Sequence, residues 1–201
     1  MAYASQLSLH QLEHDRPDLV VISPNDPQAM IQYVEECKAL NLPYIYDPSQ
    51  QIVRLTKENL QAGIRSAYGL FVNDYEAALI EKMTGWDTQR ILEVNPDIII
   101  VITRGEQGAE VYTQNNVFNI PVVTPTEIID PTGVGDAFRG GFLTGLSYGL
   151  EITQCGRMGA LAATYCLEKR GPQGHSFSRQ EFLERYKSLF QDWDHLSFLS
   201  S

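Results

Sequence analysis

Short apolar runs alternate with amphipathic stretches along the first hundred residues of the chain. Continuous apolar runs are typical of strands that are buried on both faces of a parallel sheet. The runs are LVVIS, YIYD, GLFVN and DIIIVIT, at residues 19–23, 44–47, 69–73 and 97–103. Between them, apolar residues recur at helical spacing, as at Met30, Val34 and Cys37. The alternation predicts βαβ units with right-handed crossovers.

Residues at the ends of the amphipathic stretches predict where helices begin and end. Asn25 or Asp26 can cap the first helix, and Pro27 suits its first turn. A second helix is predicted over LTKENLQAGI, residues 55–64. A third, DYEAALIEKMTG, closes at Gly85.

The pattern changes after Thr103. Residues 108–123, GAEVYTQNNVFNIPVV, are typical of a β-hairpin with its turn near 114–116. Helices are predicted at about 136–149 and 154–169 and, after a Gly/Pro loop, behind an S-x-x-E capping box that begins at Ser178. We expect residues 1–201 to form one α/β unit, with a mostly parallel sheet and an antiparallel edge hairpin.

Composition and charge argue against several classes of function. The formal net charge is −10, and no cluster of Lys and Arg is present that would neutralise nucleic acid. No apolar run approaches the ~20 residues that span a bilayer, so we expect no membrane partner. Three cysteines without a C-x-x-C pair favour reduced thiols in a cytoplasmic protein; they are Cys37, Cys155 and Cys166.

The stretch DPTGVGDAFRGG, residues 130–141, carries the strongest chemical signal. It is not a Walker loop, because no Gly-Lys pair occurs in the chain. A dinucleotide fingerprint is disfavoured, because Phe138 stands where its last glycine belongs and no strong strand runs directly into Gly133.

Two interpretations of this stretch remain open. Gly133 and Gly135 let successive amides face one concavity at a helix start, which suits a phosphoryl group in transfer, with Asp136 placed to accept a hydroxyl proton. Alternatively, Asp136 caps a helix in a tight loop, and the later glycines only allow close packing. Those glycines are Gly140, Gly141 and Gly145.

Three ordered motifs resemble the ribokinase-like family of phosphofructokinase-B type sugar and nucleoside kinases. DPTGVGDAFRGGF is similar to the family's D-T-x-G-A-G-D-x-F signature, from which it departs at Pro131 and Val134. NDYE, residues 73–76, resembles its N-x-x-E, and TRGEQG, residues 103–108, resembles its T-x-G turn. The wording of several stretches further resembles bacterial members labelled adenosine kinase or carbohydrate kinase.

The resemblance implies a three-layer αβα fold and ATP-dependent phosphorylation of a sugar or nucleoside hydroxyl. It makes Asp136 the general base. The anion hole would comprise the amides of Gly133, Val134 and Gly135, with an added contact from Thr132. Thr103 and Gly105 would line the path of the nucleotide phosphates.

The resemblance also implies cations. Asn73 and Glu76 would organise Mg²⁺ through waters, although an N-cap with a first-turn acid explains the same pair without a metal. Asp130 would either support the loop or hold a monovalent cation such as K⁺.

The resemblance covers only the C-terminal portion of the family, so we expect the N-terminal strands and the substrate lid to be absent here. The 201-residue chain alone should then bind nucleotide weakly and phosphorylate poorly. Exposed apolar surface would favour a homo-oligomer or a complementing N-terminal segment. The alternative function is a non-catalytic nucleotide-binding or assembly module descended from such kinases.

Overall fold

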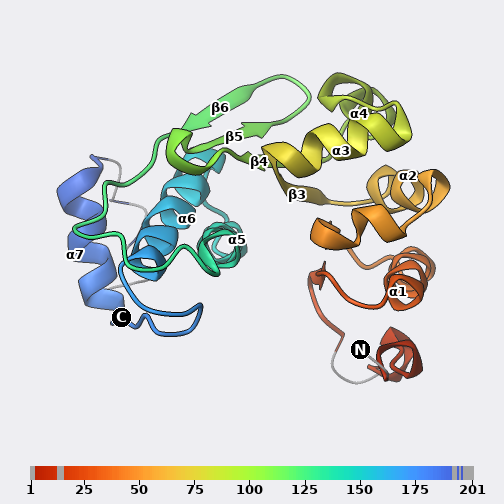
Figure 1. Cartoon of the computed structure of the whole chain (residues 1–201), viewed down its shortest axis with the longest axis horizontal. Coiled ribbons are helices and arrows are strands. Elements are labelled where there is room, and N and C mark those ends of the chain that lie inside the picture. Colours follow the sequence, from red (N-terminus) through yellow and green to blue (C-terminus); the bar gives the residue numbers. More distant parts are fainter. Residues whose placement is uncertain (1–2, 13–15, 192–193, 195, 197–201) are drawn as a thin grey trace. The chain divides into compact units, whose positions relative to one another are not determined.

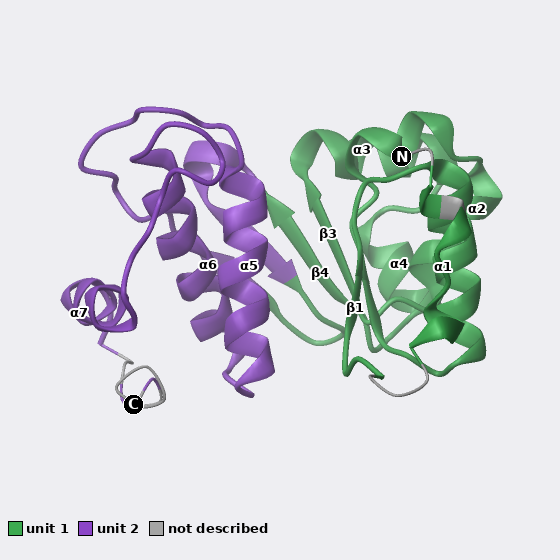
Figure 2. Ribbon diagram, turned by 90° about the horizontal axis from the view of Figure 1, so that it is seen from below, with its two compact units in different colours: residues 1–103, 112–117 green, residues 104–111, 118–201 purple. Residues whose placement is uncertain are grey.

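A computed structural model describes residues 3–12, 16–191, 194 and 196 (Figure 1). The chain divides into two compact units (Figure 2). Unit 1 comprises residues 1–103 and 112–117, and unit 2 comprises residues 104–111 and 118–201. The expectation of a single α/β unit stays a prediction.

Unit 1 is built on four parallel strands in chain order. They are β1 (Val20–Ile22), β2 (Tyr44–Tyr46), β3 (Gly69–Asn73) and β4 (Ile99–Thr103). All four coincide with apolar runs of the sequence. The register pairs Asn73 with Thr103, so the last residues of β3 and β4 lie side by side at the carboxyl edge.

The helices of unit 1 are α1 (Pro27–Ala39), α2 (Lys57–Arg65), α3 (Asp74–Thr84) and α4 (Thr88–Val94), with 3₁₀ turns η1 (Ala4–Gln6), η2 (Leu9–Gln11) and η3 (Ser49–Arg54). Right-handed crossovers between strands that follow chain order place successive helices on the same face of the sheet. Figure 2 shows α1, α2 and α4 against one side of the strands. Their apolar stripes meet alternate strand residues in one core, which includes Met30, Leu60, Leu70 and Ile100.

Local signals account for most helix ends. The Asp26 side chain caps α1 and Pro27 is its first residue, while α3 ends at Gly85 with a φ of +75°. Helix α4 was not expected from the sequence. It has only seven residues, which is too short for a clear apolar period, and its start depends on the Asp87 side chain accepting a hydrogen bond from the Arg90 N–H.

The hairpin is present as β5 (Ala109–Tyr112) and β6 (Val117–Ile120), after the 3₁₀ turn η4 (Gly105–Gln107). The sheet order is β1-β2-β3-β4-β5-β6 (Figure 1). The connections from β4 to β5 and from β5 to β6 are too short for a crossover, and such short connections join only antiparallel neighbours. The strands β4, β5 and β6 therefore alternate in direction. The predicted fold class, α/β with a mostly parallel sheet and an antiparallel edge hairpin, is confirmed.

Unit 2 contains the helices α5 (Val134–Ser147), α6 (Ile152–Leu167) and α7 (Arg179–Leu189). Helices α5 and α6 pack closely because a Cβ at Gly141 would lie 2.6 Å from the Met158 carbonyl oxygen. Gly145 packs against Cys155 in the same way, as expected. The expectation for Gly140 is wrong, because this residue is exposed and a Cβ there would meet nothing within 4 Å.

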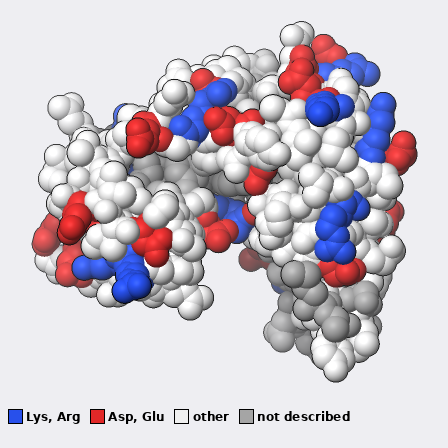
Figure 3. Space-filling model, in the orientation of Figure 1, with Lys and Arg blue, Asp and Glu red and all other residues white. Residues whose placement is uncertain are grey.

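Three further expectations concern the cysteines, membrane-spanning helices and the distribution of charge. The three cysteines are free and buried, as predicted. Within the described ranges, no helix has the length and apolar character needed to cross a membrane. On the face shown in Figure 3, Lys and Arg are scattered among Asp and Glu; that nucleic acid is no partner stays a prediction.

Candidate functional site

The loop 130–135 places a bare helix start beside Asp136. Gly133 is the N-cap of α5 with a φ of +83°, a left-handed conformation that favours glycine. Helix α5 begins at Val134, two residues earlier than predicted. In the part of the chain that the structure describes, the backbone N–H groups of Gly135 and Asp136 donate to no protein atom. These N–H groups point out of the helix start, at the positive end of its dipole.

Two other amides of the loop are less available. The Thr132 N–H donates to Asp130 Oδ1 at 2.9 Å, and the Val134 N–H makes a long turn bond of 3.4 Å to the Pro131 carbonyl. The Gly133 N–H likewise donates to no atom of the described residues, so the unbonded amides here are those of Gly133, Gly135 and Asp136, and the predicted anion hole stays a prediction.

The loop that contains Pro172 packs against this one. A Cβ at Gly133 would lie 2.5 Å from Pro172 Cβ, so the two loops pack with no room for a side chain. The buried Cys166 thiol approaches the Thr132 carbonyl at 3.5 Å. Burial raises the pKa of this thiol, and the charges of Asp130 and Asp136 add to the effect, which makes Cys166 a packing residue rather than a nucleophile.

Asp130 joins the two loops through both of its carboxylate oxygens. Oδ1 accepts from the Thr132 N–H, and Oδ2 accepts from the Gly171 N–H at 2.9 Å. Hydrogen bonds from Thr132 and then from Gly171 lower the pKa of Asp130. Loop support is therefore the role that the geometry favours, and the K⁺ alternative stays a prediction.

Asp136 does not cap the helix, in contrast to the simpler interpretation of the sequence. Its carboxylate Oδ1 instead accepts a hydrogen bond from Arg139 Nη2 at 2.5 Å, one turn further along α5. The Asp136 side chain is 72% exposed. A solvent-facing carboxylate beside two unsatisfied N–H groups is the arrangement that a proton acceptor next to an anion hole requires.

Asn73 and Glu76 form a capping box, which accounts for the presence of this residue pair without a metal. Asn73 Oδ1 accepts from the Glu76 N–H at 2.8 Å, and Glu76 Oε2 accepts from the Asn73 N–H at 2.9 Å. The other oxygen, Oε1, accepts from the Ser49 hydroxyl. The described residues hold no group of three or more His, Cys, Asp or Glu that could enclose an ion. The pair therefore fits only a cation that keeps most of its water shell.

Thr103 is the last residue of β4, and Gly105 lies within the turn that follows it. Gly105 has a φ of +55°, and the Arg104 N–H closes the turn on the Gly108 carbonyl at 2.7 Å. Arg104 also forms an ion pair with Glu110 across the same turn. The predicted residues belong to both units. Asn73, Glu76 and Thr103 are in unit 1, whereas Gly105 and residues 130–136 are in unit 2.

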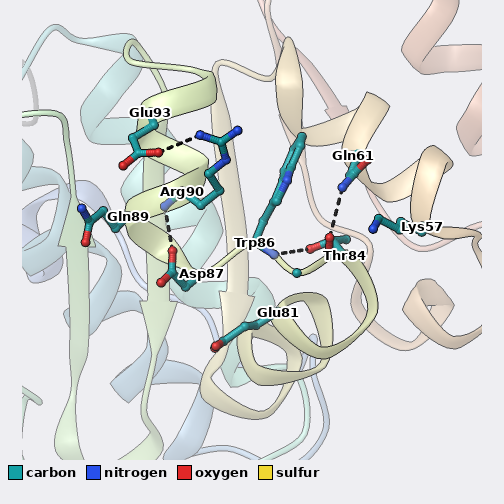
Figure 4. Close-up of a pocket in the computed structure, with 10 residues that line it drawn as sticks. Lys57, Gln61, Glu81, Thr84, Trp86, Asp87, Gln89, Arg90 and Glu93 are labelled. Carbon is teal, nitrogen blue, oxygen red and sulfur yellow. Dashed lines mark hydrogen bonds and ion pairs between the residues drawn. The ribbon is translucent and has the colours of Figure 1, made fainter.

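A depression of about 550 Å³ lies elsewhere, on unit 1 (Figure 4). Several of its polar lining residues are paired: Gln61 donates to the Thr84 carbonyl, and Arg90 pairs with Glu93. None of the predicted site residues lines it. We therefore assign it no part in the chemistry.

Sequence reasoning missed the supporting residues of the loop: Arg139, Cys166, Gly171 and Pro172. Only Arg139 left a usable signal, because its i,i+3 spacing from Asp136 predicts an ion pair on one helix face. The other three approach the loop only through the tertiary fold.

Two solved structures are closely similar to this chain. The nucleoside kinase of Burkholderia thailandensis in complex with inosine is 35% identical, with a TM-score of 0.86, over 90% of this chain and 60% of that one. The same enzyme was solved in complex with ADP-inosine, with the same identity and TM-score.

Curated relatives and a family model agree with these structures. A nucleoside kinase of Methanocaldococcus jannaschii is 30% identical over 84% of this chain, and a cytidine kinase of Thermococcus kodakarensis is 35% identical over 75% of it. The chain spans about half the length of these relatives, 55% in each case. The model of the pfkB family of carbohydrate kinases matches residues 3–178, so the chain belongs to that family, as the three motifs predicted.

Proposed function

We propose that this protein transfers a phosphoryl group from ATP to a hydroxyl of a nucleoside. The observation that carries the proposal is the start of α5, where the unbonded N–H groups of Gly135 and Asp136 lie next to an exposed carboxylate. A phosphoryl group in transfer carries dispersed negative charge, and fixed N–H donors stabilise such charge without reorganising.

Each remaining residue has a role in this proposal. Asp136 accepts the proton of the acceptor hydroxyl. Gly133, Thr132 and Asp130 hold the loop in shape, and Thr103 and Gly105 line the path of the ATP phosphates.

Asn73 and Glu76 would hold Mg²⁺ through water, as the donor set allows. When bound, Mg²⁺ supplies positive charge to the phosphate oxygens. The capping box fixes both side chains of the pair, so their oxygens would present a preformed outer shell to the ion.

The relatives described above support a nucleoside acceptor over a free sugar, since they are named nucleoside and cytidine kinases. The choice among nucleosides stays open. Adenosine is one candidate, because several stretches of the sequence resemble adenosine kinase-like members of the family. The proposal places the reaction in the cytoplasm, because all three cysteines are free thiols. Self-association or a complementing segment remains part of the proposal.

The test uses the full-length protein that contains this sequence, with ATP and Mg²⁺ and with inosine, cytidine, adenosine and ribose as acceptors. Phosphorylated products are measured by mass spectrometry. Asp136→Asn should lower turnover by ~10²–10⁴-fold, the usual contribution of a positioned base. ADP affinity, measured by calorimetry, should change little.

Glu181→Gln is the matched control, because Glu181 holds the same third helical position in α7 that Asp136 holds in α5. It should leave turnover unchanged. ADP binding without transfer to any acceptor would favour the non-catalytic module instead. Full turnover in Asp136→Asn would contradict the role of this residue.

A further inference from the structure

The ion pair between Asp136 and Arg139 joins an exposed side chain to a mostly buried one. The Asp136 side chain is 72% exposed, whereas that of Arg139 is 15% exposed. Both residues lie on the first two turns of α5, three positions apart. The guanidinium is thus confined by the protein around it, and the carboxylate is confined mainly by the guanidinium.

The two oxygens of the Asp136 carboxylate have different surroundings. Oδ1 accepts the hydrogen bond from Arg139 Nη2. No hydrogen bond from any described residue reaches Oδ2. One oxygen is therefore held, and the other is open to an incoming donor.

We infer that Arg139 is a positioning residue for the proposed base: it holds Oδ1 so that Oδ2 is the atom that accepts the hydroxyl proton. The inference rests on the proposed function and deepens it. In the step itself the acceptor O–H bond breaks, its proton passes to Oδ2, and the oxygen's electron pair forms the new bond to phosphorus as the bond from phosphorus to ADP breaks.

Positioning is required because an exposed aspartate does not orient itself. The terminal torsion of aspartate is broad, so a free carboxylate samples many orientations at the surface. A misplacement of about 1 Å at a reacting group can lower a rate by ~10²-fold. Arginine suits this task better than lysine, since its planar fork fixes direction as well as charge.

The alternative is an ordinary helix pair that only stabilises α5. Exposed i,i+3 pairs stabilise a helix only weakly and have no bearing on the rate of a reaction. The two roles therefore differ in kcat, and the pairing itself can be measured without turnover.

The first experiment tests the pairing by urea unfolding of four proteins: wild type, Asp136→Asn, Arg139→Met and the double variant. The urea midpoint of the double variant should fall by less than the sum of the two single-variant decreases. Either single change already removes the interaction between the two side chains, so the second change costs less. Additive losses would show that the pair does not form in solution, and would overturn the inference.

The second experiment measures kcat and KM in the full-length protein. Arg139→Met should lower kcat by roughly 10–100-fold while KM for ATP stays within about twofold. Arg139→Lys keeps the charge but not the fork, so it should recover only part of kcat. Arg157→Met is the control: Arg157 is another arginine of unit 2, on α6, where it lies over the Phe190 ring. It should retain wild-type kcat.

Failure of the inference and failure of the proposed function give different results. If wild type transfers phosphate, Asp136→Asn does not, and Arg139→Met retains full kcat, only the inference is overturned. Should Arg139→Met not fold, wild-type kcat in Arg139→Lys would overturn it equally. If Asp136→Asn retains the wild-type rate, the proposed function of Asp136 is contradicted, and the inference is overturned with it.

Discussion

Two helix starts in this protein share one spacing and differ in what they leave free. In α3, Asn73 is the N-cap and Glu76 is the third helical residue; in α5, Gly133 and Asp136 hold those positions. The first pair closes on itself through two reciprocal hydrogen bonds. The second pair makes no cap, so its amides remain open.

The difference begins with the N-cap residue. An asparagine side chain can accept from the third N–H of the helix, whereas glycine has nothing to accept with. Glycine also adopts the left-handed conformation that lets Pro172 pack against the loop. A closed start stabilises the fold, and an open start exposes donors that water or a ligand can satisfy.

The largest effect should come from adding a side chain at the N-cap of the open start. Gly133→Ala places a Cβ 2.5 Å from Pro172 Cβ at a φ of +83°. We expect a loss of about 2–4 kcal/mol of unfolding free energy, from strain and overpacking together. ADP binding should fall with it, since the loop must move.

Gly135→Ala is the comparison for stability, because a Cβ there meets nothing within 4 Å. Urea unfolding should show a much smaller change in this variant. Equal losses in the two variants would mean that the packing against Pro172 does not shape the loop.

A smaller effect concerns the ion pair that anchors the segment before the open start. Glu168 accepts from both Arg185 Nη atoms and from the Thr126 N–H, and its side chain is only 11% exposed. The hydrogen bond from Arg185, with that from Thr126, lowers the pKa of Glu168 from 4.5 to about 2.

Because the folded pKa lies below the unfolded value, this contribution is complete above about pH 4.5 and is lost as pH falls toward about 2. It amounts to no more than ~3 kcal/mol. Urea unfolding at several pH values checks this: wild type should exceed Glu168→Gln in stability at pH 6, and the gap should narrow below pH 4. A constant gap would contradict the linkage.

The smallest effect should come from opening a closed start. Asn73→Ala removes one half of the α3 capping box and should lower stability by ~1 kcal/mol. Ser178→Ala does the same to the box of α7, where Ser178 and Glu181 are reciprocal partners. Unfolding should report similar losses in both variants.

The two variants should differ in their response to Mg²⁺. If Asn73 helps to hold the ion in the full-length protein, Asn73→Ala should need more Mg²⁺ for half-maximal turnover, and Ser178→Ala should not. Identical Mg²⁺ curves would leave the α3 start with a structural role only.

Local chemistry explains why much of the fold was predictable. Apolar runs marked every parallel strand, and caps such as Asp26 and the Ser178 box act within four residues of themselves. Helix α4 was missed because seven residues are too few to show a helical period of apolar positions. The start of α5 was misplaced because Val134 and Gly135 have no helical signal of their own.

The sequence by itself determined the strands, the hairpin, the family, and the residue types at residues 130–136. Only the tertiary structure decided how those residues act together: that Asp130 joins two loops, that Pro172 packs against Gly133, and that Arg139 is buried where it holds Asp136. The physical reason is range. Capping and periodicity depend on neighbours a few residues away, whereas the shape of the open loop depends on residues about forty positions later in the chain.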